Sequence, residues 1–409
     1  MPGPLEGIRV LDLTWVLSGP YCAMTLCDLG AEVIKVERPP YGDVARTTGP
    51  FVNRESVYFF SINRGKKSIM LDLKKQEGKD LFLKLVDEVD VVMENFTPGS
   101  MDRLGLGYDV LSARNPRLIY SATSGFGQTG PDRERPALDV VVQGMGGVMS
   151  ITGEPGGRPV KPGFSLGDIT AGLYTAIGIL AALQERERSG KGQMVDISML
   201  DCQIAVLENA FARYSVTGEA PKPLGTRHPS TTPFQAFPTK DGYIVIALGF
   251  GLDNIWSMFC AILGVPELIY DARFETPGLR TQHHAELEPI LNEALMQKTT
   301  AEWLIDLEPL QIPCGPLQTI PEAAHHPQVQ AREMLVPVRS ERGNEVTIPN
   351  SPIKLSRTPA AIRGGPPTTG RDTREVLASL LGMTDAEIDA AFATGAAAVP
   401  EELPAELTQ

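Results

Sequence analysis

The chain has 409 residues, which is long enough for two or three domains that each enclose a core. Its composition, 42% apolar and 21% charged, is that of an ordinary globular protein and excludes extensive disorder. The formal net charge of -13 argues against nucleic acid or an anionic membrane as a partner. The five cysteines form no C-x-x-C pair, which favours buried thiols over disulfides or a zinc site.

No segment is predicted to cross a membrane or to direct export. The longest apolar stretch, near residues 171–183, is shorter than a membrane-spanning helix requires. The first residues lack the charged and apolar regions of a signal peptide. We therefore expect a cytoplasmic protein.

Residues 8–37 predict a strand, a helix and a second strand in close succession, with Pro20 near the start of the helix. Similar apolar runs predict a further helix at 77–86 and strands at 89–93 and 117–122. Strands that alternate with helices predict an α/β fold. Its large domain should hold a Rossmann-like parallel sheet, which is covered on both faces and binds ligands beyond the carboxyl ends of its strands.

The pattern changes after about residue 225. Apolar runs at 233–238 and 243–248 flank a turn and predict a β-hairpin, and helical segments follow it. A second hairpin is predicted at 337–349, and the Ala-, Pro- and Glu-rich end of the chain is expected to be loose. The predicted organisation is a large α/β domain (1–224), a smaller α/β domain (225–325), a return to the large domain (326–395) and a flexible tail (396–409).

One carboxylate is the main candidate for chemistry. Asp168 lies at the start of the apolar, small-residue helix predicted over 171–183. The amide groups and the dipole at a helix N-terminus stabilise a carboxylate, which is expected to keep Asp168 ionised and able to act as a nucleophile. The alternative is a structural N-cap, which is the commoner role of an aspartate at such a position.

Three other motifs have both a functional and a structural interpretation. Residues 125–130 match G-x-G-x-x-G, but Pro131 and a charged run follow where the helix of a dinucleotide fold should begin, so a flexible glycine loop is favoured. The basic turn 63–68 is either solvated or a phosphate contact. The adjacent histidines at 283–284 and 325–326 have no metal-ligand spacing, so we expect surface side chains and no metal site.

Short segments distributed over nearly the whole chain match one known pattern in the same order. They are residues 7–14, 18–20, 28–37, 42–43, 66–68, 94–96, 98–99, 167–168, 190–193 and 312–316. With these segments the sequence resembles the class III CoA-transferases, the CaiB/BaiF group. The resemblance implies an enzyme that moves CoA from an acyl-CoA to a carboxylic acid, in which Asp168 forms first an aspartyl anhydride and then an aspartyl-CoA thioester.

The resemblance also implies coenzyme A as the bound cofactor, no metal, and an interlocked homodimer. Positions that match the CoA-binding positions of the family are Val16, Arg38, Leu71, Asp72, Leu73, Lys74, Asn95, Phe96, Arg103, Leu104, Arg135 and Asp139. A buried remote carboxylate of the substrate needs a cation, for which Arg46, Arg227 and His228 are candidates. Gly249 and Gly251 would allow the backbone to close over the reactive anhydride.

Within the family, segment 225–245 most resembles the succinate-hydroxymethylglutarate and related dicarboxylate enzymes, which implies a dicarboxylate acceptor and a succinyl-CoA-like donor. Leu17, Pro136 and Leu138 replace residues of formyl-CoA transferase, which argues against a formyl or oxalate substrate. Leu138 also replaces the histidine base of α-methylacyl-CoA racemases, the nearest alternative. A noncatalytic acyl-CoA-binding subunit of a heteromer is a second alternative, against which Asp168 argues.

Overall fold

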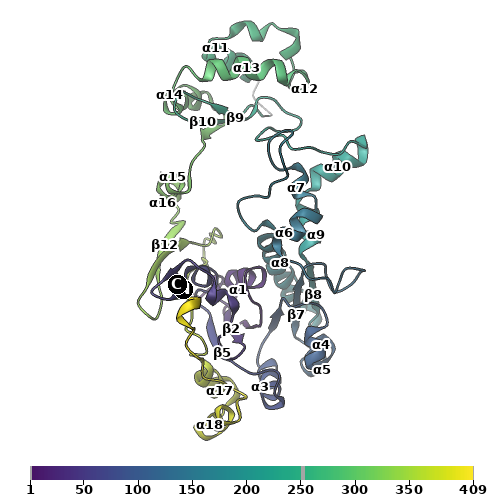
Figure 1. Cartoon of the computed structure of the whole chain (residues 1–409), viewed down its shortest axis with the longest axis vertical. Coiled ribbons are helices and arrows are strands. Elements are labelled where there is room, and N and C mark those ends of the chain that lie inside the picture. Colours follow the sequence, from purple (N-terminus) through teal and green to yellow (C-terminus); the bar gives the residue numbers. More distant parts are fainter. Residues whose placement is uncertain (1, 250–253, 409) are drawn as a thin grey trace. The chain divides into compact units, whose positions relative to one another are not determined.

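The structure is a computed structural model in which residues 2–249 and 254–408 are described (Figure 1). It divides into two compact units. The large unit comprises residues 1–148, 161–217 and 328–409, and the small unit comprises residues 149–160 and 218–327. The chain therefore leaves the large unit twice, once for a short excursion and once for most of the small unit.

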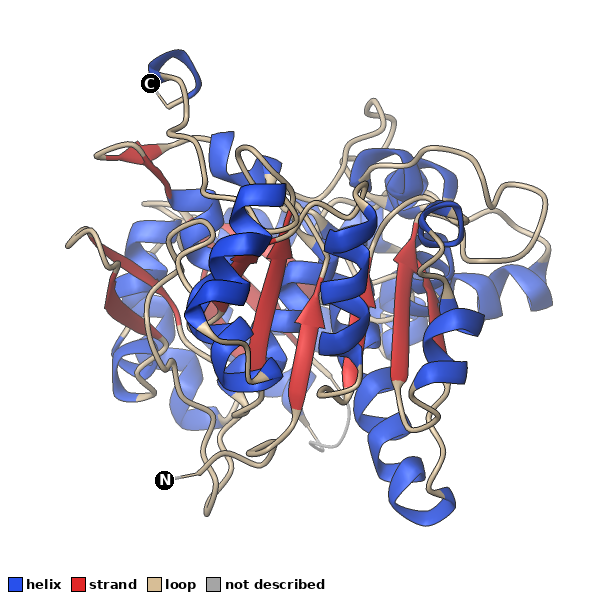
Figure 2. Ribbon diagram, turned by 90° about the horizontal axis from the view of Figure 1, so that it is seen from below, coloured by secondary structure: helices blue, strands red, loops and turns tan. Residues whose placement is uncertain are grey.

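The large unit is built on a six-stranded parallel sheet. Its strands are β1 (Arg9–Asp12), β2 (Glu32–Glu37), β5 (Lys67–Met70), β6 (Val91–Glu94), β7 (Ile119–Ser124) and β8 (Met194–Ser198). They lie in the order β5-β2-β1-β6-β7-β8, so the direction in which strands are added reverses between β1 and β6. Figure 2 shows these strands between helices on both sides. The prediction of an α/β fold with a parallel sheet is confirmed.

Alternate residues of each strand pack against different helix layers. Val10 and Val91 belong to one core with α1 (Ser18–Asp28) and α8 (Leu166–Ser189). Leu11 and Val92 belong to another core with α3 (Gln76–Val86), α17 (Thr373–Leu381) and α18 (Asp385–Thr394). All four strand side chains are fully buried. A sheet covered on both faces has apolar residues at every strand position, which explains the unbroken apolar runs in the sequence.

Helix α8 is longer than the apolar stretch recognised in the sequence. Among the described residues, it is the one helix that is long and apolar enough, by length and composition alone, to cross a membrane. Half of its apolar stretch is buried within the protein, mainly against α1 and the sheet. Gly172 permits this packing, because a Cβ there would lie 2.7 Å from the Ser18 carbonyl oxygen. Helix α8 is therefore buried in the way that is typical of a core helix.

The other elements of the large unit are short. The hairpin predicted at 337–349 is present as two paired strands. The short strands are β3 (Phe51–Val52), β4 (Glu55–Ser56), β12 (Leu335–Arg339) and β13 (Glu345–Pro349). The helices are α2 (Val57–Ile62), α4 (Ser100–Leu104), α5 (Tyr108–Arg114), α6 (Asp139–Met145), α9 (Met199–Val206), α10 (Glu208–Thr217) and α16 (Pro327–Ala331). Helix α7 (Val148–Ile151) begins at the last residue of the first large-unit segment and otherwise belongs to the small unit.

The small unit has its own core around a three-stranded antiparallel sheet. The strands, in spatial order, are β11 (Cys314–Pro316), β10 (Tyr243–Ala247) and β9 (Phe234–Pro238), and the last two form the predicted hairpin. The core includes Phe237, Ile244 and the buried Trp303. The helices are α11 (Ile255–Leu263), α12 (Pro277–Gln282), α13 (His284–Leu295), α14 (Thr300–Leu307) and α15 (Ile320–His325).

Residues 396–408 pack against the large unit. Ala396 and Ala397 are fully buried, and Ala397 forms an antiparallel bridge with Leu71. Thr408 is buried as well. The prediction of a flexible tail over 396–409 did not anticipate these contacts. An Ala- and Pro-rich end is commonly loose, but the small alanine side chain also permits close approach of two backbone segments.

Candidate active site

A pocket of about 680 Å³ opens at the carboxyl ends of the central strands. The loops that follow β1, β2, β5 and β6 form its walls, so it includes both strands that flank the reversal of strand order. This is the place where doubly wound parallel sheets bind their ligands. The residues predicted to bind CoA that line this pocket are Arg38, Leu71, Asp72, Leu73, Lys74, Phe96 and Leu104.

Hydrogen bonds join the loops after β1 and β6 at this point. The Asn95 side chain accepts a hydrogen bond from the Trp15 N–H (2.9 Å) and donates one to the Trp15 carbonyl oxygen (2.9 Å). The Trp15 and Phe96 rings meet edge to face with centroids 6.2 Å apart. The Arg38 guanidinium lies 5.4 Å from the Trp15 ring centroid. Asn95 therefore positions an aromatic wall that carries a cation at its edge.

The turn between β1 and α1 is strained. Val16 has a φ of 65°, a left-handed conformation that costs a β-branched residue about 1–3 kcal/mol. Its N–H donates to the Asp43 carboxylate (3.2 Å), which also pairs with Lys35 (2.9 Å). Both charged side chains are almost fully buried. A buried ion pair thus holds the predicted CoA contact Val16 in place beside the pocket.

Two further buried ion pairs support the same end of the sheet. Lys66 donates to Asp12 (2.9 Å), and both side chains are fully buried. Arg46 forms a two-pronged pair with Glu37, with N···O distances of 2.8 and 2.6 Å. Burial opposes ionisation of Glu37, but the Arg46 guanidinium lowers the pKa of Glu37 to about 2. The charged groups of these four side chains are therefore paired with one another and support the fold.

The buried pairs overturn two sequence interpretations. Lys66 and Arg64 in the turn 63–68 are neither solvated nor open to phosphate, because Lys66 is buried on Asp12 and Arg64 is buried on Asp28 (2.5 Å). Lys67 remains partly exposed. Arg46, predicted to contact a remote substrate carboxylate, also donates to the Pro367 carbonyl oxygen. With its guanidinium already paired, Arg46 acts as a scaffold residue, and the predicted substrate contact is not supported.

Asp168 is the third residue of α8 and is half-buried. Ser165 takes the N-cap position, so Asp168 is not the N-cap. Its carboxylate has no hydrogen bond to any residue that the structure describes. Burial, followed by the charge of Asp139, raises the pKa of Asp168 to about 7. Desolvation therefore outweighs the helix-terminus effect of about 1 kcal/mol that was expected to favour the carboxylate, and Asp168 ionises less readily than an ordinary aspartate.

Asp139 organises the backbone next to Asp168. One of its oxygens accepts the Gly167 N–H (2.8 Å), and the other accepts from Gln143 (2.7 Å). A glycine is needed at 167, because a Cβ would lie 2.8 Å from Val142 and 3.0 Å from the Asp139 carboxylate. Asp139, which was predicted to bind CoA, therefore holds α6 against the start of α8.

Tyr58, on α2, was missed by the sequence interpretation. Burial, followed by the charges of Asp168, Asp43 and Asp139, raises the pKa of Tyr58 to about 12. Its hydroxyl is therefore protonated at neutral pH. Tyr58 is therefore within electrostatic range both of Asp43, which lines the pocket, and of Asp168. No local motif marks this tyrosine, since its neighbours come from distant parts of the chain.

Two other predicted CoA contacts lie outside the pocket lining. Arg103, on α4, donates to the Ser100 hydroxyl (2.9 Å). Arg135 is exposed, pairs with Asp132 (3.7 Å) and lies 5.7 Å from the Phe126 ring centroid. The structure does not bring Arg103 and Arg135 together with the residues that line the pocket.

The remaining predicted substrate residues are in the small unit. The Arg227 N–H donates to the Leu224 carbonyl oxygen (3.2 Å). The His228 ring lies 5.0 Å from the Phe234 ring. Gly249 has open space where a Cβ would stand, whereas Gly251 lies outside the described residues.

One histidine departs from the predicted surface position. His284 is buried, and its Nε2 lies 2.7 Å from the Gln235 Oε1. Burial, followed by the charge of Arg227, lowers the pKa of His284. The adjacent-pair argument was wrong for His284 because neighbouring helix positions can face opposite environments. Within residues 2–249 and 254–408, no group of three His, Cys, Asp or Glu side chains is arranged to hold a metal ion.

The chain is similar to known CoA-transferases over most of its length. The model of CoA-transferase family III matches residues 5–373. The chain is 44% identical over 355 residues to an acetyl-CoA:oxalate CoA-transferase from Acetobacter aceti, covering 87% of this chain and 90% of that one. It is 39% identical over 393 residues to a succinyl-CoA:glutarate CoA-transferase from Mus musculus, covering 96% of this chain and 90% of that one.

A solved structure gives the same result. A CAIB/BAIF family protein from Brucella suis superimposes with a TM-score of 0.82 and 40% identity, covering 93% of this chain and 100% of that chain. The parallel α/β fold, the pocket at its switch point and the unpaired carboxylate are features of a group-transfer enzyme, here a CoA-transferase. The chain belongs to CoA-transferase family III, the CaiB/BaiF family, as the resemblance in the sequence predicted.

Proposed function

We propose that this protein moves CoA from an acyl-CoA to a dicarboxylic acid, with Asp168 as the covalent nucleophile. The observation that carries the proposal is the half-buried, unpaired Asp168 carboxylate in the same unit as a pocket suited to CoA. The apolar wall of Leu71 and Leu73 suits a planar base, and the exposed cations Arg38 and Lys74 suit its phosphates.

The reaction proceeds in two matched halves. The Asp168 carboxylate attacks the donor thioester, which gives a mixed anhydride and CoA thiolate. The thiolate then attacks the Asp168 carbonyl, which releases the donor acid and leaves an aspartyl-CoA thioester. The acceptor carboxylate attacks this thioester, and the thiolate that is released attacks the acyl carbon of the new anhydride. The products are a new acyl-CoA and free Asp168, so no net water or proton is consumed.

Tyr58 is our candidate for stabilising the oxyanion that each attack creates. Its hydroxyl stays protonated because the pKa of Tyr58 is about 12, and it lies within electrostatic reach of Asp168. A hydrogen-bond donor directed at a developing oxyanion lowers the barrier by about 3–4 kcal/mol in well-formed sites.

The proposed donor is succinyl-CoA and the proposed acceptor is a four- to six-carbon dicarboxylate. Relatives named as succinyl-CoA:glutarate and succinyl-CoA:mesaconate CoA-transferases support this choice. Oxalate is a second candidate, because the acetyl-CoA:oxalate enzyme is 44% identical to this chain. That identity weakens the argument against oxalate that was based on Leu17, Pro136 and Leu138.

We propose that Arg227, with His228, contacts the remote carboxylate of the acceptor. A guanidinium can form two parallel hydrogen bonds to a carboxylate, which makes it the best cation for this purpose. Among the residues that the structure describes, the Arg227 side chain has no ion pair that would compete with a substrate, whereas Arg46 is paired with Glu37. We retain Arg227 and His228 as substrate residues on this ground.

The two alternatives are less well supported. An α-methylacyl-CoA racemase needs a histidine base beside its aspartate. All five histidines of the sequence lie in the small unit, and Leu138, which stands at the family's histidine position, is 71% exposed. A noncatalytic subunit would have no need of an unpaired carboxylate such as Asp168.

We further propose a cytoplasmic homodimer with interlocked chains. Helices α8, α9 and α10 expose large apolar side chains, among them Ile177 (60%), Phe211 (43%) and Tyr214 (51%). An exposed apolar area of this kind is typical of an interface. Mixing tagged and untagged native protein tests the interlocking: mixed dimers should not form without unfolding, and their ready formation would exclude it.

Chemical trapping tests the mechanism. The protein is incubated with succinyl-CoA, hydroxylamine is added, and peptides are mapped by mass spectrometry. We expect a hydroxamate on Asp168, because both covalent intermediates are acyl derivatives of that side chain. The control is the variant Asp196→Asn. Burial also raises the pKa of Asp196, but no reaction is assigned to this residue. Full turnover without any modification of Asp168 would contradict the mechanism.

An acceptor screen tests the substrate class. Succinyl-CoA is offered with glutarate, mesaconate, oxalate and butyrate, and the acyl-CoA products are identified by mass spectrometry. We expect glutaryl-CoA or mesaconyl-CoA to form fastest. A clear preference for oxalate would select the second candidate, and a preference for butyrate would contradict a dicarboxylate acceptor.

A further inference from the structure

The C-terminal segment 396–408, which we call the strap, runs along the edge of the CoA pocket. Its first part pairs with the chain just after β5: the Asp72 N–H donates to the Ala396 carbonyl oxygen (3.0 Å), and the Ala398 N–H donates to that of Met70 (3.1 Å). The Glu401 N–H donates to the Pro40 carbonyl oxygen (3.1 Å). The strap is thus bonded to two loops that form walls of the pocket.

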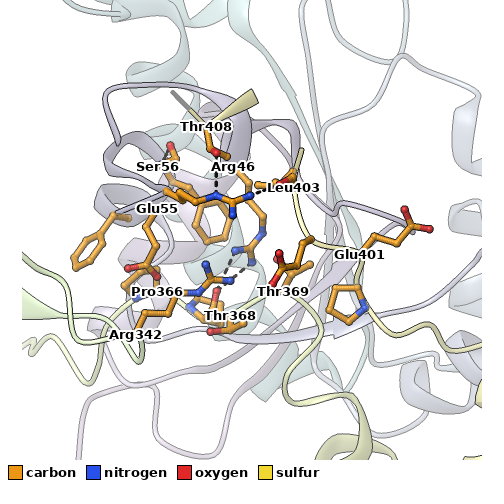
Figure 3. Close-up of a pocket in the computed structure, with 16 residues that line it drawn as sticks. Arg46, Glu55, Ser56, Arg342, Pro366, Thr368, Thr369, Glu401, Leu403 and Thr408 are labelled. Carbon is orange, nitrogen blue, oxygen red and sulfur yellow. Dashed lines mark hydrogen bonds between the residues drawn. The ribbon is translucent and has the colours of Figure 1, made fainter. Parts of the chain in front are cut away.

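Arg54 holds the far end of the strap. Its guanidinium donates to the Leu403 carbonyl oxygen (2.6 Å) and to the Thr408 hydroxyl (3.2 Å). Figure 3 shows Leu403 and Thr408 at the ends of these hydrogen bonds, in a smaller pocket of about 150 Å³ that contains the anchor. Thr408 is only 5% exposed. Specific contacts therefore fix both the beginning and the end of the strap.

Between these anchors the strap reaches the CoA pocket. Leu407 is one of the residues that line the pocket, although it lies more than 300 residues from the others. Its side chain is 45% exposed, which leaves apolar surface for a ligand to cover. The two loops bonded to the strap carry Arg38 and Lys74, the exposed cations suited to phosphates.

We propose that the strap completes the nucleotide end of the CoA site, with Leu407 as a direct apolar contact to the bound nucleotide. The inference rests on the proposed function, because it takes CoA as the occupant of the pocket. Leu407 lines the pocket, whereas Asp168, the proposed nucleophile, does not. The strap therefore contributes to recognition of CoA and does not contribute to the chemical steps.

The strap lies outside the part of the chain that defines the family. The family model ends at residue 373, well before residue 396. Leu407 is thus a binding residue that the family pattern does not describe. Binding energy from a remote part of a substrate is expressed as a lower KM when it acts equally in the ground state and the transition state.

Steady-state kinetics with two donors tests the strap. Leu407→Ala removes the proposed contact and Arg54→Met releases the anchor. Each should raise the KM for succinyl-CoA by about 3- to 10-fold, the loss expected for part of a leucine side chain, with kcat unchanged. The KM for succinyl-pantetheine, which lacks the nucleotide, should not change. Val399→Ala, an equally small change at a strap residue that is 74% exposed and not in the pocket, is the matched control.

A variant of a pocket residue outside the strap separates the two proposals. Leu73→Ala should raise the KM for succinyl-CoA if CoA occupies this pocket at all. A raised KM in Leu73→Ala, beside unchanged values in Leu407→Ala and Arg54→Met, would overturn the role of the strap alone. An unchanged KM in Leu73→Ala would overturn the placement of CoA, and with it the strap proposal. Hydrogen exchange gives a second measure: CoA should slow exchange of the strap amides in wild type.

Discussion

Two buried carboxylates of the large unit, Asp12 and Glu37, differ from the half-buried Asp168 of the same unit in their partners. Asp12 pairs with Lys66, and Glu37 pairs with Arg46. Burial opposes the ionisation of both carboxylates, but their cations leave each pKa below its ordinary value. Asp168 has no cationic partner in the described structure, and burial raises its pKa to about 7. Asp12 and Glu37 thus each have a cation beside them, whereas Asp168, the carboxylate proposed to react, has none.

The difference follows from what a nucleophile requires. A carboxylate held in a tight ion pair has its lone pairs directed at the cation and is stabilised against attack on a thioester. A carboxylate that is merely desolvated is both more basic and open to the substrate. Unpaired burial costs stability, and such a cost at a reactive group is typical of active sites.

The largest predicted effect comes from removing the unpaired carboxylate. We expect Asp168→Asn to lower kcat/KM at least about 1000-fold, since no neighbouring side chain replaces its covalent role. The same change should raise the free energy of unfolding at pH 8 by about 1–3 kcal/mol, because it removes the cost of a buried negative charge. Thioester exchange assays and denaturant unfolding measure the two effects.

The sign of the stability effect depends on pH. The folded-state pKa of Asp168 is about 7, above the ordinary value of 3.8, so the folded state holds this proton where the unfolded state has lost it. Stability therefore falls as the pH rises from about 4 to 7, and the cost is complete above pH 7. The gain from Asp168→Asn should vanish at pH 4. An equal gain at pH 4 and pH 8 would show that the effect is not due to ionisation.

The next effect comes from breaking a scaffold pair. Lys66→Met leaves Asp12 buried without its cation, so we expect the large unit to lose about 3–5 kcal/mol of unfolding free energy. The double variant Asp12→Asn with Lys66→Met removes both charges and should recover much of the loss. Lys84→Met, at an exposed position of α3, is the control for the same substitution and should change stability little. A small loss in Lys66→Met would contradict the comparison of paired and unpaired carboxylates.

The contrast between paired and unpaired charges also separates what the sequence could predict from what it could not. Strand and helix positions within 8–37 and both hairpins followed from periodicity and turn residues, which are local properties. The pocket followed as well, because parallel strands bring their carboxyl ends to one edge. Local rules could therefore place Phe96 and Leu71 near one another although they belong to different loops.

Partners far apart in the sequence could not be predicted in this way. Lys66 and Arg64 have the appearance of surface cations, since their carboxylates lie 54 and 36 positions away. Tyr58 has no motif, and its position near Asp168 depends on how α2 packs on the rest of the unit. Whether a charge is buried is decided by tertiary packing, and one sequence does not record that packing residue by residue.

A smaller effect distinguishes the two arginines proposed from the sequence for the remote carboxylate. We expect Arg227→Met to lower kcat/KM for succinate as acceptor by about 2–3 kcal/mol, or roughly 30- to 150-fold, and to affect butyrate much less. Arg46→Met should reduce activity with both acids alike, because it breaks the pair with Glu37. Equal losses for both acids in Arg227→Met would remove Arg227 as the carboxylate contact.

The smallest predicted effect concerns the charge next to the nucleophile. The reactive form of Asp168 is the carboxylate, so kcat/KM should rise with pH through an apparent pKa of about 7 and level off above it. Asp139 contributes to the raised pKa of Asp168, and Asp139→Asn removes its charge while an amide oxygen can still accept the Gly167 N–H. The rising limb should therefore move to lower pH by about half to one unit, which corresponds to about 1 kcal/mol. The pH profile with succinyl-CoA measures this shift directly. A lower plateau of kcat/KM without a shift of the rising limb would mean that Asp139 acts only by positioning α8. A shift of the rising limb at an unchanged plateau would show that the charge of Asp139 sets the fraction of Asp168 able to react at neutral pH.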